Sequence, residues 1–400
     1  MANVDTVTLG LLLFIACLVA IITRRIGFPY AVGLVLAGIG LSVAGYHSRL
    51  ELTPDLIFTV LLPPLIFEAA LHLDWREFCR ESPLVLSLAF VGTLLSAAVV
   101  AAGMHWLAGW GWPASALFGS LIAATDPVSV IATMKEQRAD KRLRFVMESE
   151  SLVNDGAAAV LFALCTAAIA GHATGPLAIG WALLTTVAGG VLTGLIVAGA
   201  LLLVAGRSDD HLVELTLTML AAYGSFVVAE WLHVSGVLAT LAAGMLVGNW
   251  DIRGWLTERG RESTLRFWDF AAFLANSVVF LLIGGREADQ RLLDYVWPAA
   301  IGIVLVLAGR AAAVYPISAL FARSRLAIDP LTRHILFWGG LRGALGLALA
   351  LAAPAVPERG ALISVAFAVV AFSIFVQGLT VPALLRRTAR EEEQVAGDHA

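Results

Sequence analysis

Apolar runs of close to twenty residues recur along the whole chain, and they limit the possible folds more than any other feature. Each run is long enough to cross about 30 Å of hydrocarbon as a helix. Of the 400 residues, 59% are hydrophobic and only 14% are charged, whereas soluble domains carry about 25% charged residues. Since backbone groups in lipid must be hydrogen-bonded within the protein, the sequence predicts an all-α polytopic membrane protein.

Charged and Gly- or Pro-rich stretches divide the chain into about thirteen predicted membrane-spanning segments. Their approximate limits are 5–23, 29–45, 54–72, 82–105, 113–134, 145–170, 176–205, 211–233, 235–249, 267–285, 294–322, 331–353 and 359–385. Residues 1–387 are expected to form one transmembrane domain. Residues 388–400 are short and charged, which predicts a disordered cytoplasmic tail.

The distribution of Lys and Arg supports an odd number of spans. With the N-terminus outside, twenty of the 26 basic residues fall on the inner side of the membrane and four on the outer side. Cytoplasmic loops are enriched in Lys and Arg, and a wrong count would reverse the later loops. We therefore expect a multi-pass protein of the cell (inner) membrane with a cytoplasmic C-terminus. The other two basic residues, Arg310 and Arg342, lie inside spans.

Cofactors and soluble partners have no sequence signal. The cysteines Cys17, Cys79 and Cys165 are scattered without metal-ligand spacing, so they indicate neither a disulfide framework nor a zinc site. We expect no cofactor and no nucleic-acid partner, and we expect the protein to be in contact with membrane lipids.

Two predicted spans contain signals for an interrupted helix. The segment "ATDPVSVIA" places Thr125, Asp126 and Pro127 in mid-span, and proline breaks or kinks a helix there. The segment "GGLRGALGLALAL" places Arg342 among glycines. Interrupted helices in both halves of a chain point to the ion site of a transporter. The alternative is a simple proline kink and close glycine packing, without an ion site.

Several polar side chains share one apolar segment, "ESESLVNDGAAAVLF". At about 100° per residue, Ser151 and Asp155 share one helix face, and Glu150 and Asn154 share a neighbouring face. A carboxylate in the membrane needs a partner or a function. We expect Glu150 to form a buried ion pair with Arg342, which leaves Asp155 without a fixed positive partner and available to a small cation or a proton.

Two further charged residues, Glu68 and Arg310, also lie inside expected spans. Glu68 follows the Pro63-Pro64 pair by one turn, and it is either a second ligand or a buried, protonated carboxyl group. Arg310 is expected to be structural, paired with helix ends or with a carboxylate.

The segments quoted above, with "LLPPLIFEAAL", "AEWLHVSGVLATLAAGMLVG", "FLANSVVFLLIG" and "FSIFVQGLTVPALL", resemble the signature stretches of the sodium/proton antiporter family, in its NhaP/NHE-type electroneutral branch. The resemblance runs from about residue 25 to residue 387. It implies two inverted six-helix repeats with interrupted, crossing helices, a homodimer, and a role in pH homeostasis. It also implies 1:1 exchange of Na⁺ (or Li⁺ or K⁺) for H⁺ by alternating access, with both ions competing for one aspartate.

The resemblance also assigns roles to residues by position. Asp155 matches the ion-binding aspartate, with Asn154 as its partner in an Asn-Asp pair. Ser151 and the Thr125 carbonyl match further Na⁺ ligands. Further matches are Glu68, which reaches in from the third span, Asp126, the acid of the interrupted fifth span, and Glu150 with Arg342, the buried ion pair.

Two other functional classes are less consistent with the sequence. An intramembrane enzyme would need a nucleophile motif or His-x-x-x-His spacing, and neither occurs, so we expect a protein that is not an enzyme. A passive channel could use the same carboxylates, although the chain has no obvious pore-loop repeat. The preference among Na⁺, Li⁺ and K⁺ does not follow from the sequence.

Overall fold

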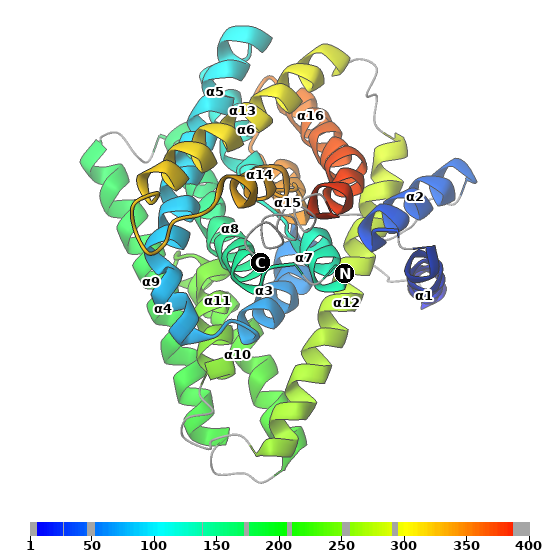
Figure 1. Ribbon diagram of the computed structural model, residues 1–400, viewed down its shortest axis with the longest axis vertical. Coiled ribbons are helices and arrows are strands. Elements are labelled where there is room, and N and C mark those ends of the chain that lie inside the picture. Colours follow the sequence, from blue (N-terminus) through cyan, green and yellow to red (C-terminus); the bar gives the residue numbers. More distant parts are fainter. Residues whose placement is uncertain are drawn as a thin grey trace, which may run out of the picture.

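The protein is helical throughout the residues that the computed structural model describes, which are 6–26, 28–45, 53–137, 139–171, 176–205, 210–249, 257–289 and 295–386. Within these ranges no residue forms a strand. The predicted all-α class is therefore confirmed (Figure 1). The expected tail, residues 388–400, lies outside the described residues.

The helices follow one another along the whole described chain. In order they are α1 (Thr6–Ile26), α2 (Tyr30–Val43), α3 (Leu62–Leu71), α4 (Trp75–Leu86), α5 (Thr93–Ala108), α6 (Trp112–Ile122), α7 (Val128–Glu136), α8 (Lys141–Ile169), α9 (Pro176–Ala205), α10 (His211–Trp231), α11 (Gly236–Asn249), α12 (Glu258–Asp289), α13 (Val296–Leu320), α14 (Pro330–Trp338), α15 (Ala344–Leu351) and α16 (Arg359–Phe372). Stretches of π-helix at Leu56–Leu61, Ser87–Gly92 and Ser373–Gln377 extend α3, α5 and α16.

Seven helical stretches of the described chain are long and apolar enough to cross a membrane. They are Trp75–Ala108, Lys141–Ile169, Gly180–Ala205, His211–Trp231, Glu258–Arg286, Val296–Leu320 and Arg359–Arg386. The first expected span coincides with α1, which has 21 residues. The remaining expected spans coincide with shorter helices or with a pair of helices that flank a break. The number thirteen stays a prediction.

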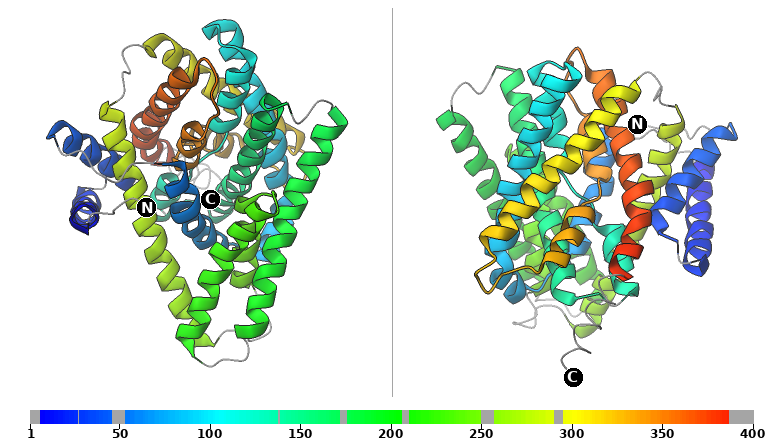
Figure 2. Two further views of the ribbon diagram at one scale, coloured as in Figure 1. Left: turned by 180° about the vertical axis from the view of Figure 1, so that it is seen from behind. Right: turned by 45° about the horizontal axis from the view of Figure 1, so that its top comes forward.

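Long helices surround a centre that contains the short helices α3 and α7 together with the long α8 (Figures 1 and 2). On one side α9, α10 and α11 pack together, and on the other α2 packs along α12 with α1 at the outer edge. Helices α3, α7 and α8 occupy the middle of the view in Figure 1. Large apolar side chains such as Trp181 and Trp297 remain exposed on outer helices, as expected of a surface in contact with lipid.

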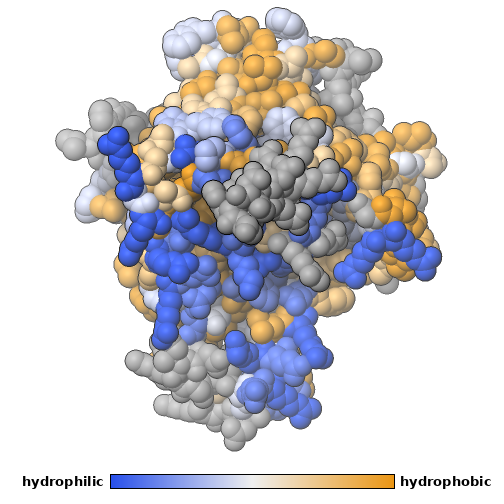
Figure 3. Space-filling view, viewed as in Figure 1, coloured by the Kyte–Doolittle hydropathy of each residue, from blue (hydrophilic) through white to orange (hydrophobic). Residues whose placement is uncertain are grey.

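Hydrophilic side chains gather on the face shown in Figure 3, across the ends of the central helices. One of these helices, α8, starts where Asp140 accepts hydrogen bonds from the backbone N–H groups of Arg142 and Leu143. Such a cap satisfies backbone donors at a helix start. Arg142 also binds the buried Glu81 of α4, with Nη2 2.9 Å from Oε2, which fixes the polar end of α8.

Candidate functional site

The fifth expected span is interrupted, as its Asp-Pro sequence predicts. Helix α6 ends at Ile122 and α7 begins at Val128. The side chain of Asp126 turns back, and its Oδ1 accepts a hydrogen bond from the Val128 N–H at 3.0 Å. The unwound residues expose carbonyl groups that helix geometry would otherwise have used.

The twelfth expected span is interrupted in the same way. Helix α14 ends at Trp338 and α15 begins at Ala344, so the glycine-rich residues between them are unwound. The two breaks touch: the Asp126 N–H donates to the Leu341 carbonyl at 2.8 Å. A Cβ on Gly343 would lie 2.2 Å from Asp126 Oδ2, so only glycine permits this approach.

Arg342 connects the two breaks through the backbone. Its Nη1 donates to the carbonyls of Ala123 at 2.7 Å and of Ala124 at 3.0 Å. Its own N–H donates to Ser373 Oγ at 2.6 Å. The guanidinium therefore donates hydrogen bonds to carbonyl groups that have no helical partner because α6 ends there.

The expected ion pair between Glu150 and Arg342 is wrong in its partner. Glu150 binds Arg310, with Nη1–Oε1 at 2.7 Å and Nη2–Oε2 at 3.1 Å. Arg310 Nη2 also donates to the Leu336 carbonyl at 3.0 Å. A Cβ on Gly340 would lie 2.7 Å from Arg310 Nε, so this glycine leaves the space through which Arg310 reaches Glu150. The expectation that Arg310 pairs with helix ends or a carboxylate agrees with this geometry.

Asn154, Ser151 and Thr125 form one hydrogen-bonded group. Asn154 Nδ2 donates to the Ala123 carbonyl at 3.1 Å and to Thr125 Oγ1 at 3.0 Å. Thr93 Oγ1 lies 2.5 Å from Asn154 Oδ1. The Ser151 hydroxyl donates to the Thr125 carbonyl. These contacts hold the unwound backbone against α8.

Asp155 lies on the wall of a cavity of about 270 Å³. Its Oδ1 is buried and has no hydrogen-bond partner among the described residues. The polar residues Glu68, Thr125, Asp126, Glu148, Ser151 and Asp155 line the cavity together, and exposed residues of α7 such as Lys135 form its rim. An unpaired buried carboxylate is unfavourable unless an ion or a proton joins it.

The cavity gathers five of the six expected ion-binding residues, while Asn154 stands behind them as a buried support. Glu150 and Arg342 are absent from the cavity lining. The sequence analysis assigned no role to Glu148 or Asn276, which both line it. Glu148 lies in the first turns of its expected span, where an acid is commonly solvated and favoured by the helix dipole. Asn276 lies within the quoted segment "FLANSVVFLLIG", which was the available signal.

The fold and this site define an ion-transporting class of membrane protein, in which two interrupted helices cross beside a carboxylate-lined cavity. The description "sodium/hydrogen exchanger, transmembrane" belongs to the family whose pattern matches residues 11–387. The chain belongs to this family.

Individual relatives agree with this assignment. The low-affinity Na⁺/H⁺ antiporter NhaS1 of Synechocystis is 37% identical over 372 residues, covering 91% of this chain and 70% of the relative. The Na⁺/H⁺ antiporter ApNhaP of Aphanothece halophytica is 35% identical, covering 93% and 71%. The solved structure of the sodium proton antiporter MjNhaP1 from Methanocaldococcus jannaschii superposes with a TM-score of 0.76 over 94% of this chain and 96% of the other, at 19% identity. This likeness confirms the antiporter fold.

Proposed function

We propose that the protein exchanges Na⁺ for H⁺ across the membrane by alternating access, with both ions competing for Asp155. One observation carries the proposal: Asp155 Oδ1 is buried and unpartnered on the wall of the cavity. The name of the family and the names of the relatives, which are antiporters and not enzymes, support the choice of ions.

The Na⁺ site consists of Asp155, Ser151 and the Thr125 carbonyl. Ser151 Oγ and the Thr125 carbonyl are already neighbours, because one donates to the other. All three residues line the same cavity. Carboxylate, hydroxyl and carbonyl oxygens are the ligands that hard cations prefer. Glu68 and Asp126 place two further carboxyl groups on the wall of the same cavity, and Glu68 reaches it from α3.

Competition follows from the chemistry of the Asp155 carboxylate, which has no positively charged side chain bound to it. The charged, empty form is unfavourable in a poorly solvated cavity, and either a cation or a proton relieves this cost. The two ligands exclude each other, since a protonated carboxyl group no longer offers full negative charge. Each turnover therefore carries one ion in each direction.

Electroneutral 1:1 exchange is part of the proposal. Asn154 is next to Asp155 in the chain, and its side-chain amide donates to Ala123 and Thr125. Because an amide does not titrate, this position supplies no second carboxylate. The two lysines of the sequence, Lys135 and Lys141, lie at the end of α7 and the start of α8.

The proposal also includes a homodimeric state, an inner-membrane location and an N-terminus on the outer side.

The test is Na⁺-driven proton movement in everted vesicles, followed with a pH-sensitive dye. Asp155→Asn should abolish exchange with protein levels unchanged, because the amide fits but cannot titrate. Ser149→Ala is the matched control, since Ser149 is buried on the same helix and its hydroxyl has no partner in the described structure. It should keep wild-type exchange. Robust exchange by Asp155→Asn would refute the site, and cation flux without proton counter-flux would indicate a channel.

A further inference from the structure

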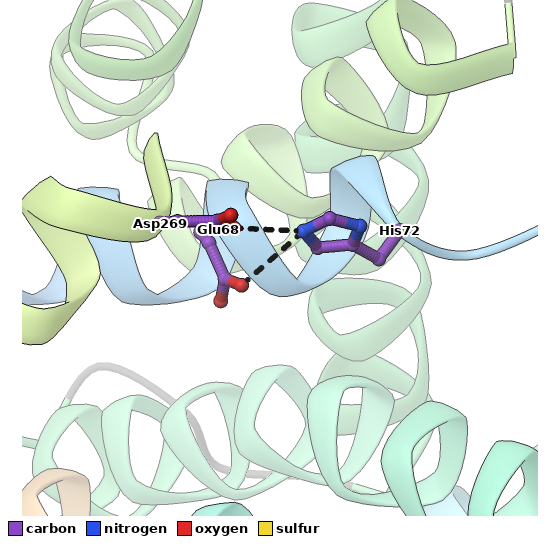
Figure 4. A group of neighbouring side chains, drawn as sticks. All are labelled: Glu68, His72 and Asp269. Carbon is purple, nitrogen blue, oxygen red and sulfur yellow. Dashed lines mark hydrogen bonds and ion pairs between the residues drawn. The ribbon is translucent and has the colours of Figure 1, made fainter. Parts of the chain in front are cut away.

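Three side chains that could bind a metal ion meet between two helices, and one of them, Glu68, also lines the cavity. Glu68 and His72 lie one turn apart on and just after α3, and Asp269 comes from α12 (Figure 4). His72 Nε2 lies 3.0 Å from Asp269 Oδ1 and 3.4 Å from Glu68 Oε1. One atom from each residue lies within 4.8 Å of the other two.

These spacings are close to those of a metal site. Two ligands that lie about 2.1 Å from a tetrahedral Zn²⁺ are about 3.4 Å apart from each other. Both measured separations from His72 Nε2 are near this value. In Figure 4 the imidazole edge faces both carboxylates, so a metal ion placed between them would meet Nε2 and two oxygens without large movement.

The three side chains are accessible to a dissolved ion. The exposed fractions are 41% for His72, 57% for Asp269 and 27% for Glu68. Glu68 also lines the cavity that contains Asp155. A metal ion held here would engage a cavity carboxylate and fix α3 to α12.

We propose that Glu68, His72 and Asp269 form a binding site for a divalent transition metal of the Zn²⁺ class, and that occupation of this site inhibits exchange. A mixed set of one imidazole and two carboxylates suits Zn²⁺ and similar ions, whereas Mg²⁺ prefers oxygen ligands in octahedral geometry. The binding part stands on the cluster alone. The inhibition part rests on the proposed exchange function.

Protons compete with the metal for the imidazole. The two carboxylates favour the protonated ring, and a metal ligand must be deprotonated. Metal binding should therefore tighten as the pH rises, and all variants are compared at one fixed pH.

The first measurement detects binding without any transport assay. Co²⁺, whose visible spectrum reports its coordination, is titrated into the purified full-length protein, and Zn²⁺ is then added to displace it. Wild type should give a saturable spectrum with one Co²⁺ per chain. His72→Gln and Asp269→Asn should each weaken binding by about tenfold or more, because outer-shell changes alone alter metal affinity by about 10–100-fold.

Matched controls separate this cluster from other ligands. His211→Gln removes a histidine that lies 3.9 Å from the carboxylate of Asp210 but belongs to no three-ligand group in the described part of the chain. Cys79→Ser removes an exposed thiol. Both variants should bind Co²⁺ as wild type does, and Mg²⁺ should not compete.

The second measurement is Na⁺/H⁺ exchange in proteoliposomes with increasing Zn²⁺. Wild type should be inhibited and should recover with a chelator, and both cluster variants should need at least about tenfold more Zn²⁺ for half inhibition. Unchanged Co²⁺ binding in both cluster variants would overturn the site, whatever the transport result. Normal binding with uninhibited exchange would overturn the inhibition alone, and absent exchange in wild type without metal would instead count against the proposed function.

Discussion

The N–H of Asp126 donates to the carbonyl of Leu341 at 2.8 Å, so a backbone group from one helix break satisfies a backbone group of the other. Arg342 adds the reverse connection through the Ala123 and Ala124 carbonyls. Unpaired backbone groups at membrane depth cost several kcal/mol each. The two interrupted helices therefore stabilise each other, and a movement of one break must involve the other.

Loss of Arg310 should destabilise the protein more than any change on the cavity surface. Arg310→Ala leaves Glu150 buried and unpaired, which costs about 3–5 kcal/mol. We expect a marked fall in melting temperature in detergent. The double variant Glu150→Leu with Arg310→Met should recover most of it, because apolar replacements of a whole buried pair are often neutral.

A thermodynamic cycle tests the partner directly. The coupling free energy of unfolding, obtained from single and double substitutions, should be larger for Glu150 with Arg310 than for Glu150 with Arg342. The reason is that Arg342 forms its hydrogen bonds with carbonyl groups. Equal or reversed couplings would contradict the geometry of the pair.

Apparent Na⁺ affinity should depend on pH in a way that identifies one shared site. If Na⁺ and H⁺ exclude each other at Asp155, the apparent dissociation constant is multiplied by (1 + [H⁺]/Ka). It should rise about tenfold for each pH unit below the point at which Asp155 takes up its proton, and level off above that point. Initial rates in everted vesicles across about pH 6 to 9 measure this. An apparent affinity that is flat across the range would exclude simple competition.

Membrane potential should leave the exchange equilibrium unchanged. A potential of 100 mV is worth about 2.3 kcal/mol for each net charge moved, and 1:1 exchange moves none. Proteoliposomes with opposing Na⁺ and H⁺ gradients, clamped at several K⁺ diffusion potentials, give the balance point. A shift of that point with voltage would require a second charge and would rule out the proposed stoichiometry.

The cap of α14 should contribute stability that depends on pH. Asp329 Oδ1 accepts the Thr332 N–H at 2.8 Å. Partial burial raises the pKa of Asp329, but the hydrogen bonds from Thr332 and neighbouring backbone groups outweigh it and leave the pKa below its usual value. Asp329→Ala should therefore cost about 0.5–2 kcal/mol at neutral pH.

The sign of the pH effect follows from the lowered pKa. The folded state favours the charged form of Asp329, so the stability that depends on its charge is full above the unfolded value of about 3.9 and is lost as the pH falls through the folded pKa. The difference in melting temperature between wild type and Asp329→Ala should therefore shrink at acidic pH toward the difference between Asp329→Asn and Asp329→Ala. Asp329→Asn keeps a capping oxygen without a titrating group, and its difference from Asp329→Ala should stay constant. Curves that remain parallel for wild type and Asp329→Ala would contradict the lowered pKa.

The sequence by itself determined the helical class and the positions of the two breaks. Long apolar runs leave a chain in lipid few options other than helices, and proline at position 127 and glycines around Arg342 are local causes of interruption. The shared face of Ser151 and Asp155 also followed from helical geometry alone. These features depend on residues that are close together in the chain.

Only the tertiary structure decided which charges meet. From the sequence, either of two intramembrane arginines, Arg310 or Arg342, could pair with Glu150. In the structure Arg310 is the partner, and the absence of a side chain at Gly340 leaves room for it. Arg342 donates to the backbone carbonyl of Ala123, which lies at the other helix break, more than two hundred residues away in the sequence. Likewise, nothing in the sequence placed Asp269 beside His72. Pairings between distant helices depend on how the helices cross, and periodicity along one helix carries no information about that.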